Sequence, residues 1–96
     1  MFTEIKMKFT AAFTLALLAL APTAAMASPA CTSEPQAKWM SEEAMKAKVD
    51  AMGYTIKTFQ VSGNCYEIYG TTKDGKRAEV YFNPVTGDVV EAEIDG

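Results

Sequence analysis

The sequence predicts a small α+β domain in which one N-terminal helix packs on a four-stranded antiparallel meander sheet. Apolar residues between positions 42 and 52 recur at helical spacing. After Gly53 the chain changes to aromatic and β-branched runs that are separated by turn residues, which is typical of antiparallel strands. A helix and a sheet with one apolar face each bury those faces against one another, so a two-layer domain is expected.

The first 27 residues have the organisation of a secretory signal peptide. Lys6 and Lys8 form a positive n-region, and the uncharged stretch 9–21 is shorter than the roughly 20 apolar residues that a membrane-spanning helix needs. Ala25-Met26-Ala27 is the small-x-small pattern that a signal peptidase reads, so we expect cleavage after Ala27. The mature chain is then periplasmic or secreted and has no transmembrane segment. An uncleaved N-terminal anchor is the alternative.

Charge and composition exclude several functions for the mature chain. The full sequence has 9 Lys and Arg against 12 Asp and Glu, and the excess of acid lies in residues 28–96. An acidic chain lacks the basic footprint of a nucleic-acid-binding protein. Histidine is absent from the sequence, which removes the commonest general base and metal ligand. We therefore expect no catalytic residues, no metal and no cofactor.

Cys31 and Cys65 are the only cysteines, and both lie in the mature chain. An even cysteine count in an exported protein predicts a disulfide. The bridge closes a loop of about 35 residues, which the chain-entropy relation values at roughly 3–4 kcal/mol. A redox pair or a zinc site is the alternative, but the first favours a C-x-x-C motif and the second needs four ligands.

The helix and its lead-in are predicted from caps and periodicity. Residues 28–37 contain two prolines and form an irregular lead-in. Ser41 is a good N-cap, and Met45, Val49 and Met52 form the apolar stripe of a helix over 42–52 that ends at Gly53. Trp39, just before the cap, is expected to pack on the same core.

Strands are predicted near 54–61, 65–72, 77–82 and 88–94. A three-residue loop at 73–75 pairs Thr72 with Lys76. Counting back from that pair sets the register of the central hairpin and places three apolar or small pairs on the helix face: Gly70 with Ala78, Ile68 with Val80 and Tyr66 with Phe82.

The two outer strands extend the same face. Phe59 and Val61 are expected beside Ile68 and Tyr66, with a bulge near Lys57 that turns the start of the strand inward. In the last strand, Val90, Ala92 and Ile94 are predicted to face the helix, and Glu91, Glu93 and Asp95 to form a solvated acidic row on the other side.

Three features occur in order along the chain: a helix that ends in Gly53-Tyr54, the strand Cys65-Tyr66-Glu67-Ile68-Tyr69, and the run from Asp74-Gly75 to Pro84-Val85-Thr86-Gly87. Together they resemble the PepSY domain, although Asn83 replaces the usual Asp. The resemblance covers about residues 38–94, and we expect the PepSY-like domain at 38–96. The resemblance implies a helix packed on an antiparallel sheet and a non-catalytic exported module that inhibits or modulates a protease. Because PepSY-like modules also occur in membrane assemblies, the alternative is an accessory periplasmic domain of an electron-transfer or transport system.

The predicted binding surface is the face of the sheet opposite the helix. Tyr69 and Tyr81, flanked by Glu67 and Glu79, are expected to present two amphipathic rings there, and tyrosine is favoured at protein interfaces. In the alternative, the lead-in covers these rings, because Cys65 lies on the same face. The expected partner is an exported or membrane-anchored protein, with a peptidase as the candidate.

Overall fold

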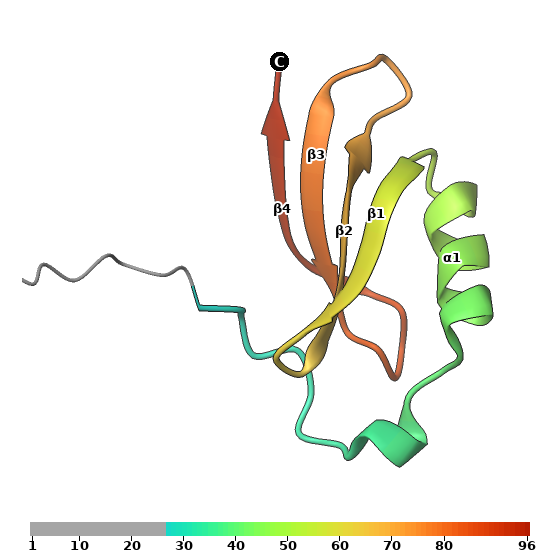
Figure 1. Ribbon diagram of the computed structural model, residues 1–96, viewed down its shortest axis with the longest axis vertical. Helices are drawn as coiled ribbons and strands as arrows, with labels where there is room; N and C mark the ends of the chain where they lie inside the picture. The colour runs from blue at the N-terminus through green and yellow to red at the C-terminus, as the bar shows by residue number, and fades with distance from the viewer. Residues whose placement is uncertain (1–26) are drawn as a thin grey trace, which may run out of the picture.

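The computed structural model describes residues 27–96, so the predicted signal peptide, apart from Ala27, lies outside the described residues. Within this range the structure has one α-helix and one four-stranded antiparallel sheet, which confirms the α+β class (Figure 1). A turn of 3-10 helix, η2, interrupts the irregular lead-in. The elements are η2 (Gln36–Lys38), α1 (Glu42–Ala51), β1 (Thr55–Ser62), β2 (Cys65–Thr71), β3 (Arg77–Phe82) and β4 (Val89–Asp95).

Helix α1 begins at Glu42 as its sequence predicts and ends at Ala51, one residue before the predicted end. The Ser41 hydroxyl accepts a hydrogen bond from the Ala44 backbone N–H at 3.1 Å, which satisfies one of the free donors of the first turn. Met45 and Val49 are fully buried. Met52 was predicted to continue this stripe, but it is the C-cap and its side chain is 44% exposed. Beyond it the backbone turns away through Gly53, whose φ of +97° favours glycine.

The sheet is a meander in which the strands follow their order in the chain, β1-β2-β3-β4. The central hairpin has the predicted register, with Ile68 opposite Val80. At its turn the Thr72 N–H donates to the Lys76 carbonyl at 2.8 Å, and Gly75 has a φ of +85°. A three-residue loop with glycine in the left-handed region therefore sets which side chains share a face.

Bulges occur in both outer strands. The register of β1 shifts between Ile56 and Thr58, as predicted. In β4 the register shifts between Tyr81 and Phe82, so that Val89 pairs with Phe82 and Val90 is the extra residue of the bulge, which the sequence pattern does not predict. The cause is the preceding turn, in which the Asn83 N–H donates to the Asp88 carbonyl at 2.8 Å and draws the start of β4 close to β3.

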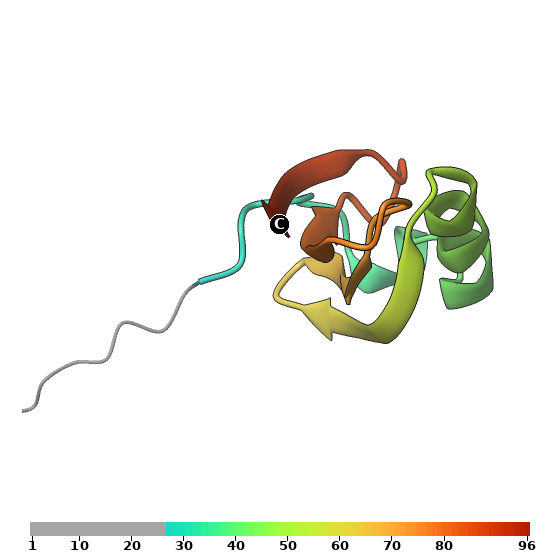
Figure 2. The same cartoon turned by 90° about the horizontal axis from the view of Figure 1, so that it is seen from above.

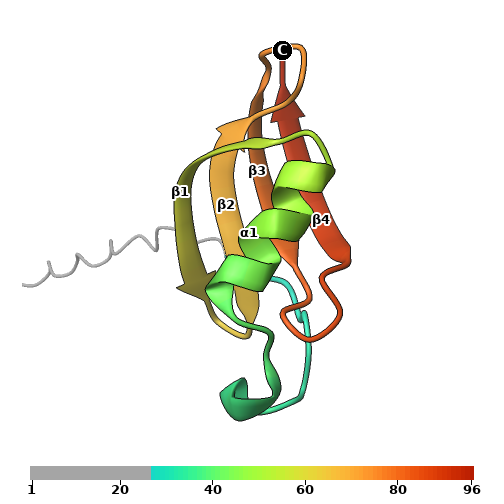
Figure 3. The ribbon, with the colours of Figure 1, turned by 90° about the vertical axis from the view of Figure 1, so that its right-hand side faces the viewer.

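The core lies between α1 and one face of the sheet, with α1 in front of the central strands (Figure 3). The Tyr66 hydroxyl donates to the Met40 carbonyl at 2.7 Å, and the Tyr66 ring meets Trp39 edge-on with centroids 5.3 Å apart, so Trp39 packs on the core as predicted. The helix does not cover β4, where Ile94 remains 42% exposed. Seven residues form the buried cluster: Met45, Val49, Tyr66, Ile68, Ala78, Val80 and Phe82.

The lead-in passes on the side of the sheet opposite α1 before the chain reaches the helix (Figure 2). There its Cys31 joins a second, smaller buried cluster with Cys65 and Tyr81. The sheet is therefore covered over much of one face by α1 and over part of the other by residues near Cys31, and the uncovered remainder of that second face carries the candidate site.

Candidate binding site on the outer face of the sheet

The central hairpin places the four predicted surface residues on one face. Alternation along β2 and β3 directs Glu67, Tyr69, Glu79 and Tyr81 away from the helix, and the register pairs Glu67 with Tyr81 and Tyr69 with Glu79. We call this side of the sheet the outer face. The four side chains are thus brought together as the sequence predicts, although their exposures differ widely.

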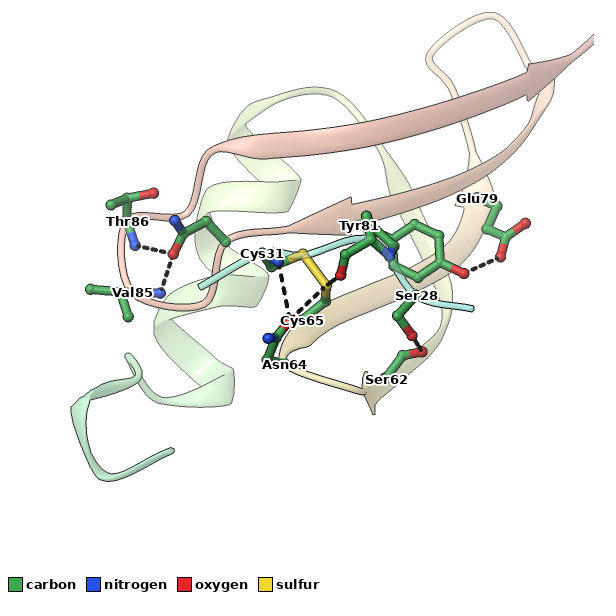
Figure 4. Close-up of a disulfide and its surroundings, with 11 residues drawn as sticks. Ser28, Cys31, Ser62, Asn64, Cys65, Glu79, Tyr81, Val85 and Thr86 are labelled. Atoms are coloured by element: carbon green, nitrogen blue, oxygen red, sulfur yellow. Dashed lines mark hydrogen bonds between the residues drawn. A yellow bond between two sulfur atoms is a disulfide. The ribbon is translucent and has the colours of Figure 1, made fainter. Parts of the chain in front are cut away.

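A disulfide clamps the lead-in to the outer face. Cys31 and Cys65 are bonded, with their Cα atoms 5.2 Å apart, and the Cys31 N–H donates to the Asn64 side-chain carbonyl at 3.1 Å (Figure 4). Ser28 adds a hydroxyl-to-hydroxyl hydrogen bond with Ser62. These contacts hold the lead-in over Tyr81, whose side chain is only 9% exposed.

The two tyrosines therefore differ. Tyr69 is 43% exposed, as the prediction requires, whereas Tyr81 is buried beneath the lead-in. The alternative weighed from the sequence, in which the lead-in covers the rings, applies to Tyr81 alone. The physical reason is that Cys65 begins β2 and its disulfide reaches only the adjacent part of β3, which leaves the other end of the hairpin open. Of the predicted binding surface, only the region around Tyr69 is open to a partner.

Two carboxyl groups and the two tyrosine hydroxyls form a single polar cluster. The Tyr69 and Tyr81 hydroxyls each donate to Glu79 Oε2 at 3.0 Å. Glu67 is only 2% exposed; its Oε1 accepts from the Gln60 amide at 2.8 Å, while its Oε2 has no donor. A buried carboxylate oxygen without a donor is costly, so a proton on Glu67 is favoured.

The pKa values of the pair move in opposite directions. Burial and the neighbouring Glu79 carboxyl group raise the pKa of Glu67 above its usual value, whereas interaction with Glu67 and the hydrogen bonds from Tyr69 and Tyr81 lower the pKa of Glu79. The Tyr69 hydroxyl, bonded to the Glu79 carboxylate, has its pKa raised to about 12. The ionised form is therefore disfavoured at Glu67 and favoured at Glu79, the carboxyl group to which both tyrosine hydroxyls donate.

An open hollow of about 200 Å³ lies on the uncovered part of the outer face. Around its rim, carboxylates outnumber the single cation, Arg77, whose guanidinium is 3.7 Å from Asp95. Both side chains of that ion pair are about four-fifths exposed, so it contributes little stability. The lining residues are Tyr69, Gly70, Arg77, Ala78, Glu79, Glu93 and Asp95.

The described residues offer no metal site and no membrane-spanning helix. Across residues 27–96, no group of three or more Asp, Glu or Cys side chains has an arrangement that could hold a metal ion. Nor does this part of the chain contain a helix long and apolar enough to cross a membrane. The chemistry available at the hollow is hydrogen bonding and charge pairing by carboxylates, one guanidinium and one phenol.

Comparison with protein families identifies the domain. The profile described as "Peptidase propeptide and YPEB domain" matches residues 10–93, which is most of the chain. The chain belongs to the PepSY family. The resemblance noted from Gly53-Tyr54, the Cys65–Tyr69 strand and the Pro84–Gly87 turn is thereby confirmed. PepSY domains are small non-catalytic domains associated with peptidases. No curated protein and no solved structure matches the chain.

Sequence reasoning missed two features of the site. It treated Glu67 as a surface carboxylate, because an acidic residue that alternates with apolar residues in an antiparallel strand normally faces solvent, and no sequence signal showed its burial. It also missed the hollow, because Glu93 and Asp95 join Tyr69 only through the pairing of β4 with β3.

Proposed function

We propose that this chain is an exported, non-catalytic binding module that modulates the activity of a peptidase. The observation that carries the proposal is membership of a family that includes peptidase propeptides. Export is supported by the signal-peptide pattern of residues 1–27 and by the Cys31–Cys65 disulfide, since disulfides persist in oxidising compartments.

The surface around Tyr69 is the proposed contact. Its ring stands half exposed on a central strand, with its hydroxyl held by Glu79, so little conformational freedom is lost when a partner packs on it. The adjacent hollow supplies carboxylates and Arg77 for polar contacts. A rigid aromatic anchor beside polar groups is a common arrangement at interface hot spots.

Capture and inhibition together test this function. The oxidised protein is immobilised, exposed to a periplasmic extract, and the bound proteins are identified by mass spectrometry; free protein is then added to the captured peptidase while hydrolysis of labelled casein is followed. We expect a peptidase to be enriched and its rate to change. Tyr69→Ala should weaken capture by about tenfold, as loss of a hot-spot side chain does.

Val61→Ala is the matched control. Val61 is 44% exposed, close to the exposure of Tyr69, but it lies on the helix side of edge strand β1. This variant should capture the peptidase as the parent does. Enrichment of no peptidase, or an unchanged rate of casein hydrolysis, would contradict the proposal. Enrichment of a cytochrome or membrane reductase instead would favour the accessory-domain function.

A further inference from the structure

The two edges of the sheet differ in how open they are. In the described part of the chain, no further strand pairs with β1 or β4. Edge β1 is interrupted by its bulge and carries an exposed lysine, Lys57, at that point, and both devices discourage addition of another strand. Edge β4 is bulged only at its start and pairs regularly with β3 from Glu91 to Asp95. The backbone N–H and C=O groups on the free edge of β4 are therefore more accessible to an added strand than those of β1.

The two faces of β4 have different chemistry. On the helix side, Val89 and Ile94, which pair with Phe82 and Ala78, are 45% and 42% exposed, because α1 does not reach this strand. On the outer side lie Glu91, Glu93 and Asp95, all exposed. An extended segment paired with β4 would meet aliphatic side chains on one face and carboxylates on the other, in alternation.

Charge decides what such a segment contains. Across the outer side of β3 and β4, Glu79, Glu91, Glu93 and Asp95 face a single cation, Arg77, in the described residues. A second copy of this chain paired through β4 would place these carboxylates opposite each other, and like charges directly opposite are destabilising. The acidic row therefore disfavours self-pairing and favours basic residues in the added strand.

We propose that the edge of β4 binds an extended segment of the partner in which basic and aliphatic residues alternate. Main-chain hydrogen bonds give the contact its register, as in other cases of β-strand addition. Each basic residue pairs with an acidic residue of β4, and the one opposite Glu93 lies beside the hollow that Glu93 helps to line. The inference rests on the proposed function, because the segment belongs to the peptidase partner.

Synthetic peptides test the proposal without the peptidase. The probe is a blocked peptide that alternates lysine with valine and matches the seven residues of β4 in length. It is compared with a peptide of the same composition arranged in blocks and with a glutamate-valine peptide. Two further probes carry N-methyl groups on alternate backbone amides: one on the odd-numbered residues of the peptide and the other on the even-numbered residues. Binding is followed by fluorescence anisotropy, and protection of the β4 amides by hydrogen exchange.

The alternating lysine peptide should bind most tightly and should protect amides of β4. One N-methylated probe should lose binding and the other should keep it, because only one set of amides faces β4 in an added strand. Glu93→Lys should weaken binding of the lysine peptide by about tenfold and should create binding of the glutamate peptide, since an opposite-charge pair is replaced by like charges directly opposite one another. Asp50→Lys, an exposed position on α1, gives the same change in net charge and should leave the affinity within about twofold of the parent.

Four results would overturn the proposal. The first two are a block peptide that binds as tightly as the alternating lysine peptide, and binding by both N-methylated probes. The other two are equal changes in affinity for Glu93→Lys and Asp50→Lys, and concentration-dependent self-association that protects the β4 amides. The last would assign the edge to a second copy. Peptide binding with no effect on a peptidase would contradict only the proposed function. Peptidase capture that Glu93→Lys leaves unchanged would contradict only the β4 inference.

Discussion

On the helix side of the sheet, Ile68, Val80 and Phe82 are fully buried among apolar side chains, whereas on the outer side Tyr81 is buried against a disulfide and beside a pair of carboxyl groups. The helix covers the first face through its own amphipathic pattern. The second face has no helix, and a lead-in with little apolar surface is held there by a covalent bond. The inner face is therefore stabilised by apolar packing, whereas the cover of the outer face is held by the Cys31–Cys65 disulfide and lies next to a buried carboxyl group, Glu67.

The largest expected effect is on the inner face. Phe82→Ala removes a fully buried ring from the core and should lower the free energy of unfolding by about 3–5 kcal/mol. Urea denaturation monitored by circular dichroism measures the loss. Val61→Ala, at an exposed position on the same side, should change this free energy by no more than about 0.5 kcal/mol. Equal effects of the two variants would show that the inner face does not hold the core.

Loss of the disulfide should have the next largest effect, and on both the stability and the cover of the outer face. Replacing Cys31 and Cys65 together by Ala should lower the free energy of unfolding by about 3–4 kcal/mol, from the larger entropy of an uncrosslinked unfolded chain. In the variant that remains folded, backbone amides of β3 next to Tyr81 should exchange faster, while those of α1 keep their protection. Uniformly faster exchange would contradict the separation of the two faces.

The two tyrosines give a paired test within the outer face. Tyr81→Ala should destabilise the protein by about 1.5–3 kcal/mol, the transfer free energy of a large buried side chain. Tyr69→Ala should leave the melting temperature nearly unchanged, because its ring is exposed. Thermal melts of both variants measure the difference. Equal melting temperatures would mean that the lead-in does not cover Tyr81 selectively.

The smallest effect is the pH dependence from Glu67. Its pKa is raised in the folded protein, so between the ordinary carboxyl value of 4.5 and that raised value the folded state holds a proton that the unfolded state has lost. The contribution of Glu67 to the free energy of unfolding is fully present below pH 4.5. It decreases as the pH rises through the pKa of Glu67 in the folded protein, by at most about 1.4 kcal/mol per pH unit. Urea titrations across this range measure the slope.

Glu67→Gln should remove this decrease, because the amide resembles the protonated carboxyl and cannot ionise. Glu79 contributes with the opposite sign: its pKa is lowered, so the stability it provides is present above 4.5 and decreases as pH falls below that value. Glu79→Gln should therefore reduce the loss of stability below pH 4.5. It should also make the decrease due to Glu67 smaller, because Glu79 contributes to the raised pKa of Glu67. A Glu67→Gln variant with the parent's slope above pH 4.5 would show that Glu67 is not the group responsible.

The elements and the pairing of the central hairpin were predictable because each depends on a local signal. Ser41 and Gly53 bound the helix, and Gly75 sets the loop length that determines the hairpin register. The bulge at the start of β4 was not predicted, because it depends on hydrogen bonds within the turn after Phe82, which no alternation pattern encodes.

The chain's sequence by itself determined the two layers, the faces of β2 and β3 and the placement of Cys65 opposite the helix, because alternation and helix caps operate over a few residues. It also determined the pairing of Cys65 with Cys31, because the sequence contains only these two cysteines. Tertiary structure decided which parts of those faces are covered. The lead-in reaches Tyr81 and not Tyr69, the helix stops short of β4, and Glu67 is buried with one oxygen lacking a donor. Which residues are covered depends on where segments distant in sequence pack against the sheet. That packing results from many tertiary contacts, which no local sequence pattern specifies.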